Sequence, residues 1–285
     1  MTISEVYQQT ISEFEMAGIP DPKTDAFRLL ESFCNVSRND ILINGDRAIA
    51  SEELKSFLEA AEERKSRKPL QYITGTEFFM GLDFAVDERV LIPRADTEIL
   101  VEEVLKDIHS GSRILDICTG SGCILISLLN YSLDCEGVGI DISDGALEVA
   151  RTNASRLLSE DKKVTFLQGD LFEALDGCEE KFEIIVSNPP YIVSEEIEKL
   201  MPEVRDYEPR IALDGTSEGI VFYKRIVDGA DRYLAGGGQI FFEIGYDQGE
   251  AVSELLKDAG YLEVKVIKDY AGLDRVVTGI KKVGK

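Results

Sequence analysis

Two spacings of hydrophobic residues divide the chain. Through residues 1–70 apolar positions recur every three or four residues, as on one face of an α-helix. Thr2 and Glu5 have the spacing of a capping box before the first such run. Asp21-Pro22 combines an N-cap with a proline suited to a first helical turn, and Ser51 opens a third helix. The pattern predicts a small all-α domain over residues 1–70.

The only dense basic segment is Arg64-Lys65-Ser66-Arg67-Lys68, at the predicted end of the third helix. Cations are favourable at a helix C-terminus, so we interpret the segment as helix-terminal charge in preference to a binding patch. Residues 71–95 indicate a connector with a β-hairpin, whose arms lie on either side of Gly81. A helix carrying Ile99 and Leu100 begins at Asp96.

From Arg113 onward short apolar runs alternate with helical patterns, which is typical of a parallel sheet covered by helices on both faces. The expected strands are Arg113–Cys118, Gly137–Ile140 with Asp141 at its end, Val164–Gln168, Phe182–Ser187, Gln239–Ile244, Glu263–Ile267 and Arg275–Ile280. No crossover helix separates the last two strands, so at least one pairing there must be antiparallel. Residues 96–285 are predicted to form an α/β domain around this mostly parallel, seven-stranded sheet.

The chain is strongly acidic, with 54 Asp and Glu against 31 Lys and Arg, a net charge of −23. Such a surface repels nucleic-acid phosphates and anionic membranes and favours a basic partner. Five cysteines without a C-x-x-C pair indicate free thiols in a reducing cytosol, with no zinc site. The single histidine, His109, lies at an expected helix end, which excludes histidine-based triads. No secretory signal or membrane-spanning run is visible, so we expect a cytoplasmic protein.

A glycine-rich turn, Cys118-Thr119-Gly120-Ser121-Gly122, joins the first strand of the α/β domain to a helix. Glycines let the backbone approach a nucleotide-like ligand there, and the helix offers free N–H groups. Asp141 ends the next strand, where a carboxylate accepts hydrogen bonds from ribose hydroxyls. The alternative for Asp141 is a helix N-cap, which Ser143 supplies equally well. This pair fits either a nicotinamide cofactor or S-adenosylmethionine (SAM).

Three details favour SAM. Asp116 lies within the first strand, where a carboxylate helps to hold a cationic methionine moiety through water or loop amides. Asp170 and Leu171 follow the third strand, where an acid can meet the adenine amino group and an apolar side chain its face. A terminal antiparallel strand pair is common in methyltransferases and rare in nicotinamide domains.

Asn188-Pro189-Pro190-Tyr191 directly follows the fourth strand. The prolines fix φ and donate no N–H, and Asn188 is pushed toward extended geometry because it precedes a proline. The backbone carbonyls are therefore held stiffly and are not consumed by a following helix. This segment suits a site that grips an NH₂ group on a flat substrate.

With this motif the chain resembles the Asn-Pro-Pro-Tyr class of SAM-dependent N-methyltransferases and, within it, the HemK/PrmC-type peptide-chain release-factor glutamine N5-methyltransferases. The resemblance covers nearly the whole chain. Its matching segments are Pro69–Gly75, Leu91–Glu98, the glycine-rich turn, Ser187–Ile192, Glu208–Leu213 and Phe242–Gly245. Long matches in the right order are far more specific than the tetrapeptide.

The resemblance implies a Rossmann-like class I SAM-dependent methyltransferase domain, preceded by a helical domain that docks the protein substrate. It implies N5-methylation of the glutamine in the Gly-Gly-Gln motif of release factors, which tunes translation termination and yields S-adenosylhomocysteine. It also implies SAM contacts at Cys118, Thr119, Gly120, Ser121, Gly122, Asp141, Leu171 and Asn188, and glutamine contacts at Asn188, Pro189, Pro190 and Tyr191. The family often has glycine in place of Cys118, and some members have an aromatic residue in place of Leu171.

A carboxamide nitrogen is a weak nucleophile because its lone pair is delocalised into the carbonyl. We expect Asn188 Oδ1 and the Pro189 carbonyl to accept hydrogen bonds from the two N–H groups of the substrate amide. We expect Tyr191 to pack against the substrate side chain and exclude water. Catalysis by these three residues then rests on proximity and electrostatic preorganisation, without a strong base.

Other functions fit parts of the pattern. A DNA or RNA amino-methyltransferase must flip a base and track phosphates, which the net charge opposes. A glutamine methyltransferase acting on a ribosomal protein is a closer alternative, although Asp96-Thr97-Glu98 favours the release-factor branch. A non-catalytic SAM-sensing module and a nicotinamide oxidoreductase agree less well with the intact Asn188–Tyr191 motif. We expect a monomer that binds release factors and contacts neither nucleic acid nor membrane directly.

Overall fold

The computed structural model describes residues 1–283, which divide into two compact units. The helical unit comprises Met1–Gly75 and Met201–Tyr207, and the α/β unit comprises Thr76–Leu200 and the chain from Glu208 onward. The expected connector over 71–95 is not a separate element. Its first residues form α5 (Leu70–Thr74) in the helical unit, whereas the predicted hairpin, β1 (Thr76–Phe79) and β2 (Leu82–Ala85), belongs to the α/β unit.

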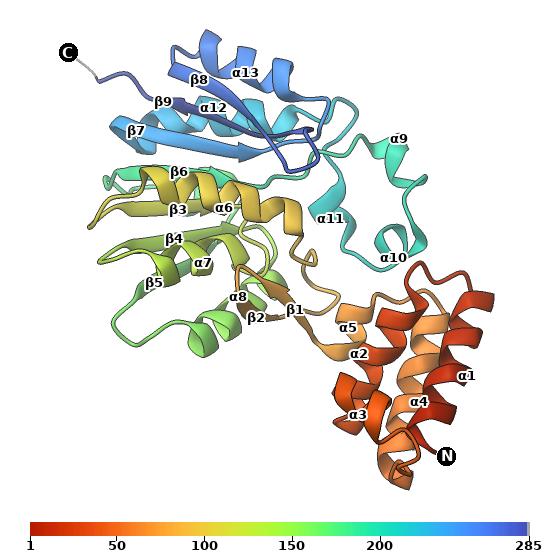
Figure 1. The fold of residues 1–285 in the computed structure, drawn as a ribbon. Helices are drawn as coiled ribbons and strands as arrows, with labels where there is room; N and C mark the ends of the chain where they lie inside the picture. Colours follow the sequence, from red (N-terminus) through yellow and green to blue (C-terminus); the bar gives the residue numbers. More distant parts are fainter. Residues whose placement is uncertain (284–285) are drawn as a thin grey trace. The chain divides into compact units, whose positions relative to one another are not determined.

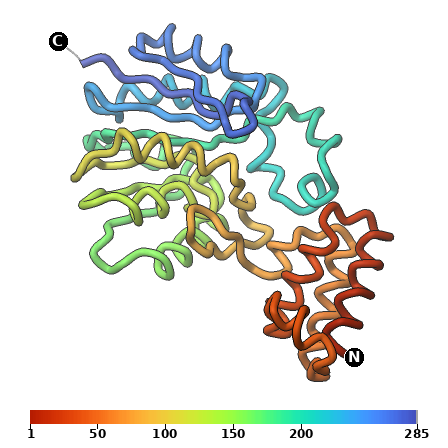
Figure 2. Tube along the Cα trace, viewed as in Figure 1, coloured from red at the N-terminus to blue at the C-terminus, as the bar shows by residue number. Residues whose placement is uncertain are grey.

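The helical unit is built on three amphipathic helices, α1 (Ile3–Met16), α2 (Pro22–Cys34) and α4 (Ser51–Lys65), which lie side by side (Figure 2). The predicted capping box of Thr2 is present, and Asp21 caps α2 through the backbone N–H of Thr24. Phe14, Leu30 and Phe57 form the fully buried centre of this unit. The sequence reading missed α3 (Arg38–Ile43), which buries none of its residues and so shows no apolar periodicity.

A buried ion cluster completes the helical unit. Arg64 donates through Nε to Asp25 Oδ2 at 2.7 Å and through Nη2 to Glu203 Oε1 at 3.0 Å. Arg67 holds the same Glu203 with two donors, each at 2.7 Å. Arg64 and Lys65 do lie in the last turn of α4, but carboxylates compensate their charge more than the helix end does. The interpretation of this basic segment as helix-terminal charge is therefore correct only in part.

The α/β unit contains a seven-stranded sheet with helices on both faces (Figure 1). Its strand order is β5-β4-β3-β6-β7-β9-β8, and the pairings from β5 to β7 are parallel. The strands are β3 (Arg113–Ile117), β4 (Glu136–Asp141), β5 (Lys163–Gln168), β6 (Phe182–Ser187), β7 (Leu234–Glu243), β8 (Leu262–Lys268) and β9 (Asp274–Ile280). As expected, the terminal pairings are antiparallel, since β9 runs against both β7 and β8.

Alternating side chains of each strand feed two separate cores. Ile114 of β3 packs with α6 (Ala95–Asp107) and α7 (Cys123–Tyr131), whereas Leu115 packs on the face covered by α12 (Val221–Tyr233) and α13 (Gly249–Asp258). The first face also carries α8 (Asp144–Leu157). This burial on both faces explains why the strands read as continuous apolar runs.

Several local features depart from the sequence reading. Residues 236–238, the triple glycine expected before β7, lie inside it, next to an irregularity in the pairing of β6 with β7. Four short elements were not predicted: η1 (Leu171–Leu175), α9 (Ser194–Ile197), α10 (Pro202–Arg205) and α11 (Arg210–Leu213). Within residues 1–283, none of the helices has the length and apolar character needed to cross a membrane.

Candidate active site

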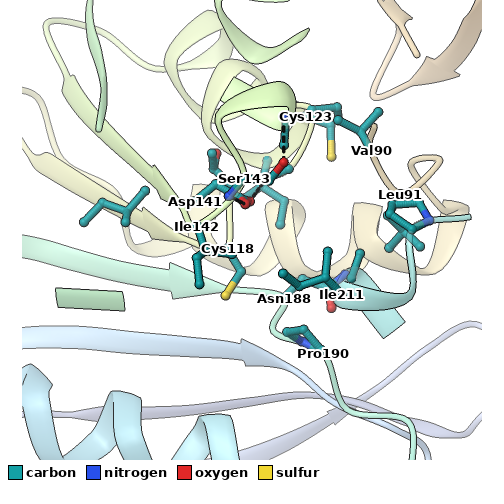
Figure 3. Close-up of a pocket in the computed structure, with 18 of the residues that line it drawn as sticks. Val90, Leu91, Cys118, Cys123, Asp141, Ile142, Ser143, Asn188, Pro190 and Ile211 are labelled. Carbon is teal, nitrogen blue, oxygen red and sulfur yellow. Dashed lines mark hydrogen bonds between the residues drawn. The ribbon is translucent and has the colours of Figure 1, made fainter. Parts of the chain in front are cut away.

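A cavity of about 260 Å³ opens at the carboxyl ends of β3, β4 and β6, near the lower end of ligand-sized pockets (Figure 3). The strand order reverses between β3 and β6, because β4 and β5 lie on one side and β7 on the other. Open parallel sheets bind ligands at such a switch point. The cavity walls come from the loops that follow these strands and β5, from residues 89–97 and 209–212, and from Phe222 and Arg225 of α12.

Asp141 organises the glycine-rich loop. Its Oδ2 accepts the Gly120 N–H at 2.8 Å, and its Oδ1 accepts the Ser143 N–H at 2.9 Å. Burial raises the pKa of the Asp141 carboxyl, and these backbone hydrogen bonds oppose that rise. Ser143, not Asp141, caps α8 through the Ala146 N–H, so the alternative of a helix N-cap is not what the structure shows for Asp141. Lone pairs of a cavity-facing carboxylate are thereby left for hydroxyl donors.

Most residues expected to contact SAM line this one cavity. They are Cys118, Thr119, Gly120, Ser121, Asp141, Leu171 and Asn188. Gly120 has φ +55°, and a Cβ built on it would meet no atom within 4 Å, so the backbone there is open to a ligand. Gly122 is different: it is not part of the cavity wall, and a Cβ on it would lie 2.9 Å from Ile126 Cδ1. Its role in the structure is close packing beside α7.

The two positions that depart from the family pattern share a backbone property. Cys118 has φ +63° and Leu171 has φ +53°, in the left-handed region that favours glycine. Both side chains line the cavity. Cys118 lies just beyond β3 and was expected to be its last residue.

Apolar and charged residues line the cavity where β4 and β5 end. Ile142, the residue after Asp141, lines the cavity although the residue is 48% exposed. An exposed apolar residue beside the Asp141 carboxylate suits the face of a flat ring, and the sequence analysis did not single it out. Asp170 also lines the cavity and accepts from Arg225 Nη2 at 2.8 Å. Asp116, in contrast, is fully buried beneath the loop, accepts from Thr119 Oγ1 at 2.6 Å and is not part of the wall.

The Asn188–Tyr191 segment divides between wall and interior. Asn188 and Pro190 line the cavity, whereas Pro189 is buried and Tyr191 is partly buried outside the wall. The Tyr191 hydroxyl donates to Glu243 Oε1 at 3.4 Å, and Asn188 Nδ2 donates to Thr97 Oγ1 at 3.4 Å. Tyr191 is expected to pack against the substrate, but in this structure it lies outside the cavity wall and its hydroxyl binds Glu243.

Two further residues join this polar group without having been assigned a role. Thr97, in the first turn of α6, and Glu243, at the end of β7, are each 2% exposed. Burial raises the pKa of the Glu243 carboxyl, while hydrogen bonding to Thr97 and the positive charge of Arg275 oppose that rise. Both residues lie in segments that match the family, Leu91–Glu98 and Phe242–Gly245. Their positions along the chain did not show that they would lie near Asn188.

The opposite wall comes from two other family-like segments. Leu91 and Ile211 contribute apolar surface (Figure 3), and Ile211 is 56% exposed. Arg94 forms an ion pair with the buried Glu208, which joins these two segments. Together with the loop of β3 they give one cavity with an acidic side at Asp141 and a carboxamide at Asn188.

Comparison with known proteins agrees with this geometry. The PrmC N-terminal domain model matches residues 5–75, and a methyltransferase domain model matches residues 108–261. A methyltransferase structure from Pyrococcus furiosus has the same fold, with TM-score 0.52 and 19% identity, and covers 82% of this chain and 100% of that chain.

Two curated relatives extend over nearly the full length. The release factor glutamine methyltransferase of Geobacter sulfurreducens is 40% identical over 278 residues, which cover 98% of this chain and 96% of the relative. That of Clostridium acetobutylicum is 41% identical over 278 residues, which cover 97% of this chain and 95% of the relative. The chain therefore belongs to the release factor glutamine methyltransferase family.

Proposed function

We propose that this protein transfers a methyl group from SAM to the side-chain nitrogen N5 of the glutamine in the Gly-Gly-Gln motif of peptide-chain release factors. The observation that carries the proposal is one cavity lined by both the Asp141 carboxylate and the Asn188 carboxamide. The first is suited to a ribose and the second to a flat substrate with an NH₂ group. Family membership supports the choice of protein substrate.

The residues present fit SAM. SAM supplies a methyl group on a positively charged sulfur, so the methyl carbon is electrophilic. Asp141 offers acceptors to the two ribose hydroxyls, and the open face of Gly120 admits the ligand close to the backbone. Ile142 and Leu171 offer apolar surface to the adenine ring. The net negative charge of the protein favours a cationic donor.

Asn188 addresses the weak nucleophilicity of the amide. Its Oδ1 and the Pro189 carbonyl accept hydrogen bonds from the two N–H groups of the substrate amide. These hydrogen bonds orient the nitrogen and favour its partial pyramidalisation. The nitrogen forms a bond to the methyl carbon, the carbon–sulfur bond breaks with its electron pair left on sulfur, and the nitrogen releases one proton to water. Proximity and preorganised acceptors lower the barrier in this scheme, and no histidine is required.

The acceptor is a protein in this proposal, and the enzyme acts as a cytoplasmic monomer without direct contact to nucleic acid. The net charge of −23 supports a protein over a polyphosphate partner. The helical unit docks the release factor, as the family resemblance implies.

The direct test is incubation with methyl-labelled SAM and, separately, a release factor, ribosomal proteins and DNA. We expect label only in the release factor, at the glutamine of Gly-Gly-Gln when its peptides are sequenced by mass spectrometry. A release factor with that glutamine changed to glutamate is the control and takes up no label. Label in DNA or in a ribosomal protein alone would overturn the assignment.

The role of Asn188 has its own test. Asn188→Ala removes the acceptor Oδ1, and we expect kcat to fall at least about 100-fold, as when one preorganised hydrogen-bonding group is lost from an active site. SAM binding is measured in parallel by calorimetry. Asn130→Ala makes the same substitution on α7, away from the cavity, and leaves kcat unchanged. Near-normal turnover of Asn188→Ala with SAM still bound would refute the role.

A further inference from the structure

Four polar side chains form a group that extends from the cavity wall, where Asn188 and Thr97 lie, to Tyr191 and Glu243 behind it. Asn188 Nδ2 donates to Thr97 Oγ1, and the Tyr191 hydroxyl donates to Glu243 Oε1. The Thr97 hydroxyl also interacts with the Glu243 carboxyl, whose pKa it lowers. The side chains of Asn188 and Tyr191 are therefore both connected to the buried Glu243 carboxyl. Asn188 is connected through the Thr97 hydroxyl, and Tyr191 through its own hydroxyl.

The surrounding structure holds this group in place. Thr97 follows Asp96, which forms an ion pair with Arg275 at 3.1 Å, and Arg275 also binds Asp269 at 3.2 Å. The backbone carbonyl of Glu243 accepts the Tyr223 hydroxyl at 2.8 Å. The start of α6 and the end of β7 are thus each fixed by contacts outside the polar group.

Hydrogen-bond polarity then decides how Asn188 faces the cavity. A carboxamide has a donor end and an acceptor end, and exchanging the two changes what it can bind. The Tyr191 hydroxyl donates to Glu243 Oε1, and the Thr97 hydroxyl lowers the pKa of the same carboxyl, as a donor directed toward it does. The Thr97 oxygen is left to accept Nδ2 of Asn188, and Oδ1 is turned toward the cavity. The Asn188–Thr97 and Tyr191–Glu243 hydrogen bonds are each 3.4 Å long, so the group has room to tighten when substrate binds.

We propose that Thr97 and Glu243 are positioning residues for the methyl acceptor: together they hold the Asn188 carboxamide with Oδ1 toward the substrate. The proposal rests on the proposed function, because it assigns this orientation a task in binding a carboxamide NH₂. It also gives a basis for specificity. Oδ1 attracts the NH₂ of glutamine and repels the carboxylate of glutamate, which would be attracted if the Asn188 amide were reversed.

Thr97→Val is the decisive variant, because it keeps the shape of the side chain and removes the hydroxyl. With saturating SAM, we expect kcat for the release factor to fall about 10- to 100-fold, in line with one lost hydrogen bond in a buried polar group. SAM affinity stays within about 3-fold by the same reasoning, since Thr97 makes none of the contacts at Asp141. Thr97→Ser restores the hydroxyl and recovers kcat to within about 3-fold of the wild type.

A second readout separates positioning from general disturbance. The release factor with glutamate in place of the target glutamine is tested as a competitive inhibitor. It inhibits the wild type weakly, and Thr97→Val binds it at least about 5-fold more tightly, because the freed amide can present Nδ2 to a carboxylate. Thr278→Val is the matched control: Thr278 is buried in β9, and its hydroxyl has no hydrogen-bond partner within residues 1–283. It leaves both values unchanged.

Distinct outcomes separate the two proposals. No methylation of release factor by the wild type removes the proposed function itself. A wild type that methylates release factor, together with wild-type kcat and inhibition for Thr97→Val, overturns the positioning role alone. Equal losses in Thr97→Ser and Thr97→Val overturn it as well. If Thr97→Val does not bind SAM, Glu243→Gln replaces it: its new amide donor competes for Thr97, lowers kcat about 10-fold and tightens inhibition, and unchanged values refute the proposal.

Discussion

Glu203 in the helical unit and Glu243 in the α/β unit are the same residue type at similar burial, 9% and 2% exposed. Burial raises the pKa of Glu203, but hydrogen bonds from Arg67, from backbone and from Arg64 outweigh it, so the net pKa is lowered. Burial also raises the pKa of Glu243, and there the net pKa stays raised, because the hydroxyls of Thr97 and Tyr191 and the charge of Arg275 only partly oppose it. One carboxyl is fully compensated by charge and the other is not.

The difference teaches how to separate structural from functional polar groups in this chain. The ion cluster of the helical unit satisfies its members with one another, so it holds a fold together and leaves little to bind a ligand. The carboxyl ends of the central strands carry incompletely satisfied atoms, including Asp116 Oδ1 and Glu243 Oε2, within the described residues. Such atoms cost stability, and at the carboxyl ends of these strands they lie beside the cavity, where a ligand or substrate is one physical reason for keeping them.

The largest effect is expected in the ion cluster of the helical unit, where opposite charges compensate each other. Arg64→Ala leaves Asp25 buried without its partner, and we expect the free energy of unfolding to fall by about 3–5 kcal/mol. Urea unfolding of the full chain measures it. Arg64→Lys keeps a charge but loses the guanidinium fork that binds two carboxylates. Its free energy of unfolding is therefore expected between those of the wild type and Arg64→Ala.

The matched control for Arg64 is an exposed pair. Lys55 lies 3.8 Å from Glu59 with its side chain 78% exposed, and Lys55→Ala should cost about 0.5 kcal/mol or less. An Arg64→Ala protein as stable as Lys55→Ala would break the comparison.

The next effect concerns Asp116, whose pKa burial raises from 3.8 to about 7, with its hydrogen bond to Thr119 opposing the rise. Between those values the unfolded chain has lost the proton that the folded chain keeps, so the free energy of unfolding falls as pH rises from about 4 to 7. Asp116→Asn removes this pH-dependent decrease in the free energy of unfolding. We expect it to stabilise the protein by on the order of 2 kcal/mol at pH 8 and not at pH 4, since one pKa unit corresponds to about 1.4 kcal/mol.

Unfolding curves of Asp116→Asn at several pH values check this, with exposed Asp258→Asn as control. The same protein tests whether Asp116 helps to hold SAM from beneath the loop. SAM affinity that drops with Asp116→Asn supports a role through the loop amides. Equal gains at pH 4 and pH 8 would contradict the titration.

The smallest effect tests backbone strain at the cavity. Cys118 has φ +63°, so Cys118→Gly should stabilise the protein by about 0.5–1 kcal/mol, because glycine adopts this conformation without a steric penalty. Thermal unfolding measures the gain. Cys178 has no such φ, and Cys178→Gly should destabilise through the added freedom of the unfolded chain. A Cys118→Gly protein less stable than the wild type would show that its side-chain packing outweighs strain.

Local sequence information predicted the framework well. Helix caps at Thr2 and Asp21, the β1–β2 hairpin and the seven strands follow from side-chain periodicity and turn chemistry over a few residues. Asp141 and Asn188 could be placed in one cavity because carboxyl ends of parallel strands share an edge of a sheet.

Two of the errors originate in contacts distant along the chain, and a third in the shortness of some helices. The place of residues 201–207 in the helical unit depends on Glu203 pairing with Arg64, 139 positions away. The grouping of Thr97 and Glu243 behind Asn188 depends on which strands become neighbours. The four-residue helices α9, α10 and α11 are too short to show a period.

The discontinuity of the helical unit has a consequence in time. Residues 1–75 are synthesised first, with Arg64 and Arg67 already in place, but Glu203 follows only after residues 76–202. At about 5–20 residues per second, that delay is roughly 6–25 s. During it the strands β3 to β6 are made while Arg64 has only one of its two carboxylate partners, Asp25, and Arg67 lacks Glu203. The last step in forming the first unit of the chain therefore waits for the middle of the second.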